Sequence, residues 1–562
     1  MSNLRHLRSD RKKLGLFISA LIITFGVIPL LILTYYPELK YSYRIEPFAL
    51  RSEDGVYISA FKYTPETEKS HAGIVVCHGF FGNKLNMQPL SIELVKRGFT
   101  VLNIDFRGHG ASGGSFLRKD LIKDIKAAVD YFEYELSYIT EIGLVGHSIG
   151  AEITALFSRS YPNKINATVA IGGVSSNFTG ISNLLLVTGL YDPGLREERI
   201  IEILQLYTGK EDVYVGKAYN GDFNHGNNIK GYISPFSGHL TEVVDSAILY
   251  QIVQWFEQAF NGEKGSNIFI TATLLQIFSY VALFGVIMLN AIIIVYLSNY
   301  FFRQKIEYPE RDIFGEAGEY SIKKLIAYYA IPAVLIQFIV FLFLIDILVE
   351  IIPYSTASIT LSLIVGAAIG AFLIYTFILL SWEERFFFKH VPLKIKKMCS
   401  IHPKRSMLYG ILIALQSILS IAAIWHWSVQ NTLPTVREIG TMIFITLISF
   451  PFFLIREFYF RNVQGRLKTS HKYEEYFIMV GIGIFMDNFI IVSIIIIGRL
   501  NLAYLPAYAL YLLVWVIFSI IQQFSVTWVY INSGRNILGS TIFLSIFYSW
   551  MLVVFFPSYG FL

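Results

Sequence analysis

Charged residues and cysteines are both scarce in this sequence of 562 residues. Asp, Glu, Lys and Arg make up 15% of the chain, whereas hydrophobic residues make up 54% and the mean hydropathy is +0.53. Soluble domains normally carry about 25% charged residues, so this composition predicts that much of the chain lies in lipid. The net charge is only +5, and most basic residues stand in short loops beside apolar runs. We therefore expect them to orient the chain in a membrane, and we predict no nucleic-acid partner.

The two cysteines are Cys77 and Cys399, which the topology derived below places on opposite sides of the membrane. No intramolecular disulfide is therefore expected. No cluster of Cys and His has the spacing of a zinc site. We accordingly predict neither a bound metal nor another cofactor.

Nine apolar runs are long enough to cross a membrane. The first, residues 14–36, follows a basic segment at residues 1–13, and its 23 residues match a hydrocarbon core of roughly 30 Å. A cleaved signal peptide is the alternative, but this run exceeds a signal h-region and lacks a clear A-x-A site, so we expect an uncleaved anchor. Eight more runs follow, at 268–299, 325–349, 358–380, 407–427, 438–455, 476–498, 505–530 and 537–556.

Lysine and arginine are distributed unevenly between the two sets of loops. With the N-terminus inside, the inner segments hold 23 of these residues, whereas the short outer loops hold only Arg437 and Arg499. Because inner loops are enriched in positive charge, this predicts a cytoplasmic N-terminus and an extracytoplasmic C-terminus in the cell membrane. The long segment between the first two spans then lies outside. Two glycosylation sequons, at Asn166 and Asn177, fall in it, although Asn166 is expected to be part of a buried strand.

Residues 44–262 differ from the rest, because charges are spread through them and the apolar runs shorten to strand length. Residues 48–63 predict two strands around the Asp54-Gly55 turn. Amphipathic helical patterns then alternate with short apolar runs, and strands are expected at 73–79, 99–106, 142–148, 166–173 and 184–192. Apolar strands joined by helices predict a mostly parallel, doubly wound sheet covered on both faces. The expected fold class is an outer α/β domain joined to an all-α transmembrane domain at residues 268–556.

The stretch LVGHSIGA contains the pattern G-x-S-x-G around Ser148. The pattern alone is expected roughly 0.2 times by chance in a chain of this length, but here a predicted strand precedes it and a predicted helix follows it. This context is typical of a serine nucleophile on a tight strand-to-helix turn, which needs glycines around it. Its oxyanion hole would use the backbone N–H of Ile149 and that of Phe80, which lies in the loop HGFFGNK.

The acid and the base of such a site should follow Ser148 in the order Asp, then His. Asp192 ends the last of these strands, where a carboxylate can orient an imidazole, although a cap of the following helix explains the same position. His239 follows a strand-like run and precedes an amphipathic helix, and it is the favoured base. His225, in an expected hairpin turn, is the alternative. Poorer candidates are Glu197 and Asp212 as the acid and His78 as the base.

At these residues the outer domain resembles the α/β-hydrolases, in the branch of serine hydrolases that includes monoacylglycerol lipases and serine aminopeptidases. The resemblance rests on HGFFGNK, IDFRGHGASGG and GHSIGA, in that order, and it covers residues 44–262. It implies that Ser148 is the nucleophile, His239 the base and Asp192 the acid. Only about ten residues separate the strands at 166–173 and 184–192, where relatives often insert a helical cap, so we expect an open site.

The expected function is cleavage of an ester, thioester or amide by a membrane-embedded serine hydrolase on the outer face. Short tethers at both ends keep the domain near the bilayer, which favours a lipid ester over a soluble ester or peptide substrate. A membrane acyltransferase is a close alternative, and a transporter or channel with a ligand-binding outer domain is another. The last would give a role to Asp487, which stands in the middle of a predicted span; a protonated Asp487 bonded to neighbouring helices explains it equally well. The oligomeric state is not predicted.

Overall fold

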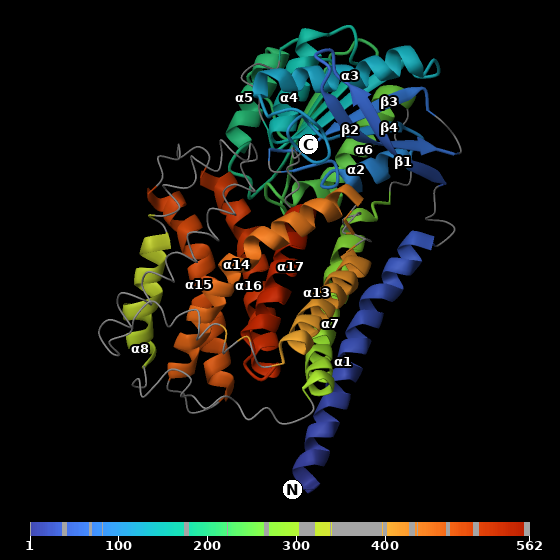
Figure 1. The fold of residues 1–562 in the computed structure, drawn as a ribbon. Helices are drawn as coiled ribbons and strands as arrows, with labels where there is room; N and C mark the ends of the chain where they lie inside the picture. The colour runs from blue at the N-terminus through green and yellow to red at the C-terminus, as the bar shows by residue number, and fades with distance from the viewer. Residues whose placement is uncertain are drawn as a thin grey trace.

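The computed structural model has an α/β domain stacked on one end of a bundle of long helices (Figure 1). Helix α1 (Ser2–Tyr35) precedes the domain in sequence and helix α7 (Ala272–Phe301) follows it. The structure describes residues 2–35, 42–66, 70–80, 82–173, 179–221, 223–262, 269–302, 321–337, 339, 396, 399, 402–425, 433–434, 436–467, 472–497 and 505–555.

The described strands of the α/β domain form a single nine-stranded sheet with the order β1-β2-β4-β3-β5-β6-β7-β9-β8. Strands β1 and β2 form the hairpin predicted around Asp54-Gly55, and β2 joins β4 in antiparallel register. From β4 to β9 all neighbours are parallel, and β8 returns antiparallel to β9. The mostly parallel sheet predicted from the sequence is therefore confirmed. The strands are β1 (Tyr43–Arg51), β2 (Tyr57–Pro65), β3 (Ala72–Cys77), β4 (Thr100–Ile104), β5 (Glu141–His147), β6 (Ala167–Ile171), β7 (Leu184–Gly189), β8 (Ala218–Tyr219) and β9 (Ile229–Ser234).

Helices cover both faces of this sheet. Helices α2 and α6 pack on one face, and α3, α4 and α5 pack on the other. Successive strand residues point to opposite faces, so Val75 packs beneath α3 whereas Val76 packs beneath α2. This double cover explains why every residue of β3 is buried and apolar or small. The helices are α2 (Gln88–Val95), α3 (Leu121–Glu135), α4 (Ile149–Ser160), α5 (Glu197–Thr208) and α6 (Ser246–Asn261).

The other described helices of the chain are mostly long and apolar. Five contain a segment long and apolar enough to cross a membrane: Lys13–Thr34, Ala272–Phe301, Pro403–Trp425, Ile439–Arg461 and Ile537–Val554. The predicted spans at 476–498 and 505–530 correspond to α15 and α16. The predicted span at 358–380 lies outside the described residues, and that at 325–349 is described only at 325–337 and 339. The remaining helices are α8 (Ile322–Leu325) with a following π-helical turn (Ile326–Ala330), α13 (Pro403–Trp425), α14 (Val436–Arg466), α15 (Lys472–Ile497), α16 (Leu505–Asn532) and α17 (Ile537–Phe555).

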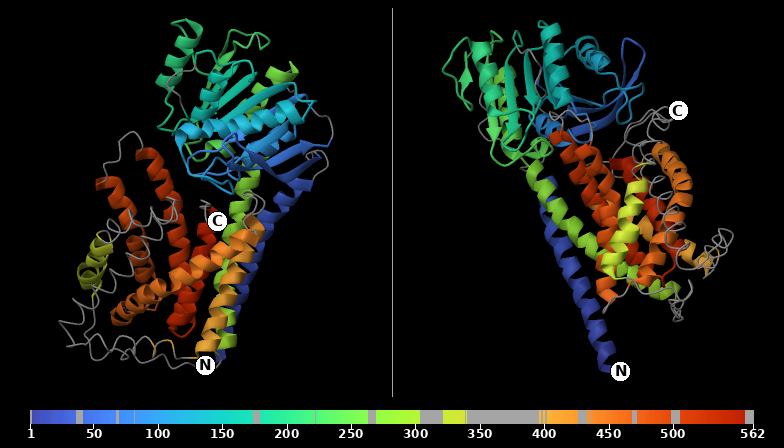
Figure 2. Two further views of the ribbon diagram at one scale, coloured as in Figure 1. Left: turned by 45° about the horizontal axis from the view of Figure 1, so that its top comes forward. Right: turned by 90° about the vertical axis from the view of Figure 1, so that its left-hand side faces the viewer.

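Helices α1 and α7 lie side by side along their length (Figure 2). Their closest approach uses small residues, because a Cβ on Gly26 would lie 2.6 Å from the Cβ of Ala282. The N-terminus lies at the end of α1 that is far from the α/β domain (Figure 1). The same pair of helices therefore tethers both ends of the domain.

Helix α14 corrects one boundary expected from the sequence. The predicted span ends at residue 455, which places Arg456 and Arg461 among the inner-loop cations. In the structure α14 continues to Arg466, and both arginines are at most 5% exposed. They are buried because acidic side chains on α14 and α15 pair with them, a contact that hydropathy alone does not reveal.

A buried hydrogen-bond cluster docks the α/β domain on the start of α7. Glu93 of α2 accepts hydrogen bonds from the N–H groups of Thr271 and Ala272 at 3.0 and 3.2 Å, and from the Thr271 hydroxyl at 2.8 Å. The Nζ of Lys96 donates to the same hydroxyl at 2.6 Å. In the first turn of α7, the Thr273 hydroxyl donates to the carbonyl of Val244. Glu93 thus caps a helix of the other domain, because the first amides of a helix have no intrahelical partner.

Two smaller expectations concern the α/β domain. Asn166 precedes β6 and is exposed, contrary to the expectation of a buried strand position. Its side-chain oxygen accepts a hydrogen bond from the N–H of Ile142, and its own N–H donates to the carbonyl of Ile142, so it continues the pairing of β5 with β6. Asn177 lies outside the described residues. Cys77 and Cys399 are both free thiols, as expected.

Candidate active site

Ser148 stands on a sharp turn between β5 and α4. Its backbone has φ 56° and ψ −118°, a strained combination for a residue that is not glycine. The turn brings α4 so close to the strand that a Cβ on Gly146 would lie 2.3 Å from the carbonyl carbon of Gly150. The glycines of G-x-S-x-G are therefore required by close backbone approach, and the serine side chain is presented at the carboxyl edge of the sheet.

The structure brings Ser148, His239 and Asp192 into one chain of hydrogen bonds. The Ser148 Oγ and His239 Nε2 are 3.0 Å apart, and His239 Nδ1 and Asp192 Oδ2 are 2.9 Å apart. Each residue follows a different strand, namely β5, β9 and β7. Because the carboxyl ends of parallel strands meet at one edge of the sheet, residues 91 and 47 positions apart in the sequence become neighbours. In this geometry the imidazole can take a proton from the hydroxyl while the carboxylate holds its other nitrogen.

Asp192 is fixed by two further contacts. Its Oδ1 accepts a hydrogen bond from the N–H of Gly194 at 2.6 Å, and its Oδ2 accepts one from the Thr188 hydroxyl at 3.3 Å. Burial alone would raise the pKa of Asp192, but the hydrogen bond and charge of His239 hold it below its ordinary value. The alternative role as a helix cap is wrong, because α5 begins at Glu197 with Arg196 as its N-cap.

The loop expected to complete the oxyanion hole lies against Ser148. A Cβ on Gly79 would lie 3.2 Å from the Cβ of Ser148, and Phe80 is the next residue. Ile149 begins α4, so its N–H is among the amides that have no partner within the helix. The Phe80 N–H shares its peptide group with the carbonyl of Gly79, which accepts a hydrogen bond from His78 Nδ1 at 2.7 Å and is oriented by it. His109 Nε2 donates to the next carbonyl, that of Phe80, at 2.6 Å.

A buried ion pair braces the same loop, and sequence reasoning did not identify it. The carboxylate of Asp105 accepts hydrogen bonds from the backbone N–H of Lys84 at 2.7 Å and from its Nζ. It also accepts the N–H of Ala111 at 2.8 Å. These contacts join the two motifs HGFFGNK and IDFRGHGASGG. The presence of both motifs in one sequence was the only signal that could have indicated the ion pair.

The poorer candidates lie in ordinary structural surroundings. His78 is fully buried, donates from Nδ1 to the carbonyl of Gly79 at 2.7 Å and accepts at Nε2 from the N–H of Phe106 at 3.0 Å. Burial lowers the pKa of His78 to about 3. His225 is exposed in the connection between β8 and β9, which is the hairpin expected there. Glu197 and Asp212 are both exposed.

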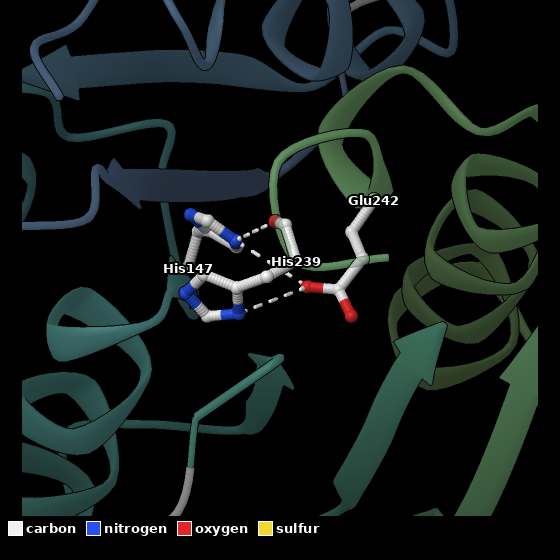
Figure 3. Close-up of side chains that lie close together, drawn as sticks. All are labelled: His147, His239 and Glu242. Carbon is white, nitrogen blue, oxygen red and sulfur yellow. Dashed lines mark hydrogen bonds and ion pairs between the residues drawn. The ribbon is translucent and has the colours of Figure 1, made fainter. Parts of the chain in front are cut away.

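Two residues that sequence reasoning missed lie beside the imidazole of His239 (Figure 3). His147 Nε2 donates to the backbone carbonyl of His239 at 2.8 Å and lies 3.3 Å from Glu242 Oε2. The same Glu242 oxygen lies 3.9 Å from His239 Nδ1. Glu242 is fully buried at the start of the short 3₁₀ helix η2 (Glu242–Val244). An acidic residue at the start of a helix is common, so the sequence carried no signal for this position.

His147 Nε2, His239 Nδ1 and Glu242 Oε2 lie within 4.8 Å of one another, a spacing that could hold a metal ion. The donor atoms do not fit this use well, because His147 Nε2 already binds the carbonyl of His239 and His239 Nδ1 binds Asp192. A metal would have to displace both hydrogen bonds. The arrangement fits a hydrogen-bonded network better than a metal site.

Asp487, the ionisable residue expected within a span, lies on α15 and contacts two neighbouring helices. Its carboxylate pairs with Arg456 of α14 and accepts hydrogen bonds from Ser519 and Gln523 of α16. Asp487 thus has a cationic partner, Arg456. A protonated Asp487 would need only polar neighbours. This charge is offset within the bundle.

The comparisons with known proteins concern the α/β domain. The family described as serine aminopeptidase, S33, matches residues 68–183. A monoacylglycerol lipase of Mycolicibacterium smegmatis is 26% identical over 176 residues, which cover 30% of this chain and 61% of that protein. A probable alcohol acetyltransferase of Cyberlindnera jadinii is 34% identical over 107 residues, which cover 19% of this chain and 30% of that protein. The chain thus spans less than two thirds of the length of either relative.

Among solved structures, an esterase of Pyrococcus furiosus is similar, with 19% sequence identity and a TM-score of 0.33, over 39% of this chain and 92% of that chain. A serine hydrolase without a lid from Xanthomonas campestris has 16% identity and a TM-score of 0.31, over 40% and 97%. The family match, the sheet order and the turn at Ser148 agree on the α/β-hydrolase fold for the α/β domain.

Proposed function

We propose that this protein is a membrane-embedded serine hydrolase that cleaves an ester, thioester or amide through an acyl-enzyme on Ser148. The observation that carries the proposal is the unbroken chain of hydrogen bonds from Ser148 through His239 to Asp192, with distances of 3.0 and 2.9 Å. Ser148 is the nucleophile, His239 the base and Asp192 the acid.

The reaction proceeds in two halves. Ser148 Oγ attacks the carbonyl carbon of the substrate while its proton passes to His239 Nε2. The N–H groups of Ile149 and Phe80 stabilise the oxyanion of the tetrahedral intermediate. His239 then protonates the leaving alcohol, thiol or amine, and the acyl group remains on Ser148. A water molecule that gives its proton to His239 attacks the acyl-enzyme, releases the acid and restores Ser148.

Large exposed apolar side chains stand in the two loops that carry Asp192 and His239, and they favour an apolar substrate. Phe236 and Leu240, which flank His239 in its loop, are 84% and 40% exposed, and Tyr191, beside Asp192, is 71% exposed. Exposed apolar groups of this size around a polar centre are typical of binding surfaces. Together with the tethering helices α1 and α7, they support a lipid ester at the bilayer surface as the substrate class.

We further propose the nine-span topology, with the α/β domain and the C-terminus outside. Three contacts support the alternation of the described spans, because each joins helix ends that the loop charges assign to the same side. The Ser298 hydroxyl donates to the carbonyl of Asn532, Arg535 pairs with Glu475 at 2.9 Å, and a Cβ on Gly539 would lie 3.3 Å from the carbonyl oxygen of Ser406.

Acyl transfer to an alcohol is a second candidate, and the resemblance to a probable alcohol acetyltransferase favours it. The acyl-enzyme is common to both reactions, and only the acceptor in the second half differs. Product analysis in the presence of a lipid alcohol separates them: hydrolysis yields free acid, whereas transfer yields a new ester.

The deciding experiment is labelling of intact cells with a membrane-impermeant fluorophosphonate probe, which modifies activated serines. We expect labelling of the wild type and of Ser160→Ala, a control at the exposed end of the same helix, and none of Ser148→Ala. Equal labelling of Ser148→Ala, or none of the wild type in opened cells, contradicts the hydrolase. Labelling only after the cells are opened contradicts the outer location.

A further inference from the structure

Glu242, Asp192 and His239 meet over a single backbone position, the turn after β6. A Cβ on Gly172 would lie 2.2 Å from Glu242 Oε2, 2.8 Å from Asp192 Oδ2 and 3.0 Å from His239 Nδ1. Because Glu242 Oε2 and Asp192 Oδ2 both lie so close to this one point, the two carboxyl groups are immediate neighbours. A second carboxyl group therefore stands beside the one that orients the imidazole.

The two oxygens of Glu242 have different surroundings. Oε1 accepts hydrogen bonds from the N–H of Gly189 at 2.7 Å and from the Thr188 hydroxyl at 3.1 Å, whose single proton it shares with Asp192 Oδ2. Oε2 is buried and accepts no hydrogen bond from the described residues. A buried acceptor without a donor is unfavourable. The conflict is resolved if Oε2 carries a proton, because it then donates to the neighbouring carboxylate.

The charges around Glu242 also favour its protonated form. The titratable groups that face it are Asp192, after β7, His147 of β5 and His239 of its own loop. No Lys or Arg of the described residues forms an ion pair with it. Burial and the negative charge of Asp192 raise the pKa of Glu242 well above its ordinary value, and burial lowers the pKa of His147 to about 3. Two carboxyl groups this close hold one negative charge between them, and Asp192 keeps it because His239 binds it.

We propose that Glu242 is a positioning residue that remains a neutral carboxylic acid and donates its Oε2 proton to the carboxylate of Asp192. This inference rests on the proposed function. Through Oε1 the residue is anchored to the end of β7, and through its backbone it belongs to the loop of His239. Glu242 thereby ties the loop of the base to the strand of the acid and holds Asp192 Oδ2 toward His239 Nδ1.

Two substitutions in the full-length protein test this role. Glu242→Gln keeps the shape, the acceptor oxygen and a donor toward Asp192, so we expect kcat and KM close to those of the wild type. Glu242→Leu removes the donor and leaves the N–H of Gly189 unpaired. We expect kcat to fall about 10- to 100-fold through misplacement of the acid and base, with KM changed less than about twofold, because Glu242 does not contact the substrate.

The pH profile separates a neutral Glu242 from a charged one. The acid limb of kcat/KM reports protonation of the base. If Glu242 is neutral, Glu242→Gln leaves this limb in place. If Glu242 is an anion, its removal about 4 Å from the imidazole shifts the limb to lower pH by at least about one unit, and the proposal is overturned. Glu257→Gln, which removes a buried carboxyl group on α6, is the matched control and should leave the limb unmoved.

Labelling of Ser148 keeps the two hypotheses distinguishable. A wild type that the fluorophosphonate does not label contradicts the hydrolase function itself. A labelled wild type with Glu242→Leu as active as the wild type overturns only the role of Glu242. If Glu242→Leu does not fold, the pH profile of Glu242→Gln still decides between the two charge states.

Discussion

Asp192 is the residue on which most contacts of the site converge. One oxygen binds His239 and Thr188, and the other binds the backbone of its own turn at Gly194. Its charge is therefore needed both to hold the imidazole and to stabilise the imidazolium that forms during the reaction.

For Asp192→Asn we expect kcat to fall about 10³- to 10⁴-fold, because an amide favours the wrong tautomer of the imidazole. The measurement is hydrolysis of a short-chain ester by purified protein, with thermal unfolding to verify the fold. Asp212→Asn, an exposed aspartate on the same domain, serves as the control and should keep full activity. An Asp192→Asn enzyme within tenfold of the wild type would remove Asp192 from the mechanism.

His147 makes the stability of the domain sensitive to acid. Its pKa is lowered from 6.5 to about 3, mainly by burial. The folded domain thus binds this proton less readily than the unfolded chain. The contribution of neutral His147 to the free energy of unfolding is therefore fully present above about pH 6.5, and it is lost as the pH falls toward 3. Between pH 6.5 and 4.5 this residue should lower the free energy of unfolding of the wild type by about 2 to 3 kcal/mol.

The test compares the pH dependence of unfolding in the wild type and in His147→Gln, which keeps a donor toward the carbonyl of His239. The acid-induced loss should be smaller in the variant by this amount. His225→Gln, a change of an exposed histidine, should follow the wild-type curve. Parallel curves for all three proteins would mean that His147 is already protonated in the folded domain.

At the scale of elements, the turn after β6 leaves no space for a side chain. Gly172 has φ 56°, and a Cβ there would contact the side chains of Glu242 and Asp192 at 2.2 and 2.8 Å. Gly172→Ala should therefore lower kcat about 10- to 100-fold by displacing these groups. It should also destabilise the domain by more than the roughly 1 to 2 kcal/mol of a left-handed alanine.

Gly180 provides a matched control for this turn. It has φ 79°, and no heavy atom lies within 4 Å of the position that a Cβ would occupy, so Gly180→Ala carries the backbone strain without the collision. Activity should be retained in Gly180→Ala and lost in Gly172→Ala. Equal loss in both would assign the effect to backbone strain alone.

Elements were predictable from local patterns to within a few residues. The expected strand at 99–106 is β4 at residues 100–104, and the helix expected to begin at Ile149 does so. The helical pattern expected between the strands at 99–106 and 142–148 is divided into the 3₁₀ turn Arg118–Asp120 and α3. Boundaries shift because they depend on the hydrogen bonds of the terminal residues, which apolar periodicity does not encode.

At the scale of the whole molecule, Glu93 connects the two halves of the protein. For Glu93→Ala we expect the free energy of unfolding to fall by about 2 to 3 kcal/mol, because buried amides at the start of α7 lose their acceptor. Amide hydrogen exchange should accelerate at residues 271–275. It should also accelerate in η2, because Thr273 binds the carbonyl of Val244. Glu53→Ala, at an exposed glutamate of the same domain, should leave both regions unchanged. Unaltered exchange in Glu93→Ala would mean that this contact does not hold the domain on the bundle.

The site residues illustrate how far a sequence alone leads. Ser148 was identified from its neighbours, because a nucleophile turn has a local pattern of glycines between a strand and a helix. Asp192 and His239 were chosen by chain order and by their places at strand ends. Glu242 could not be chosen, because its contacts with Asp192 and Gly189 join residues about fifty positions apart.

The sequence by itself determined which segments are apolar, where the strands and helices of the α/β domain occur, and which serine stands on a tight turn. These properties follow from side-chain periodicity and backbone sterics within a few residues. Only the tertiary structure decided which distant groups face one another: Glu242 beside Asp192, Glu93 at the start of α7, and Arg456 opposite Asp487. The reason is physical, since burial removes water from these polar groups and each must then find its partner wherever packing brings one within reach.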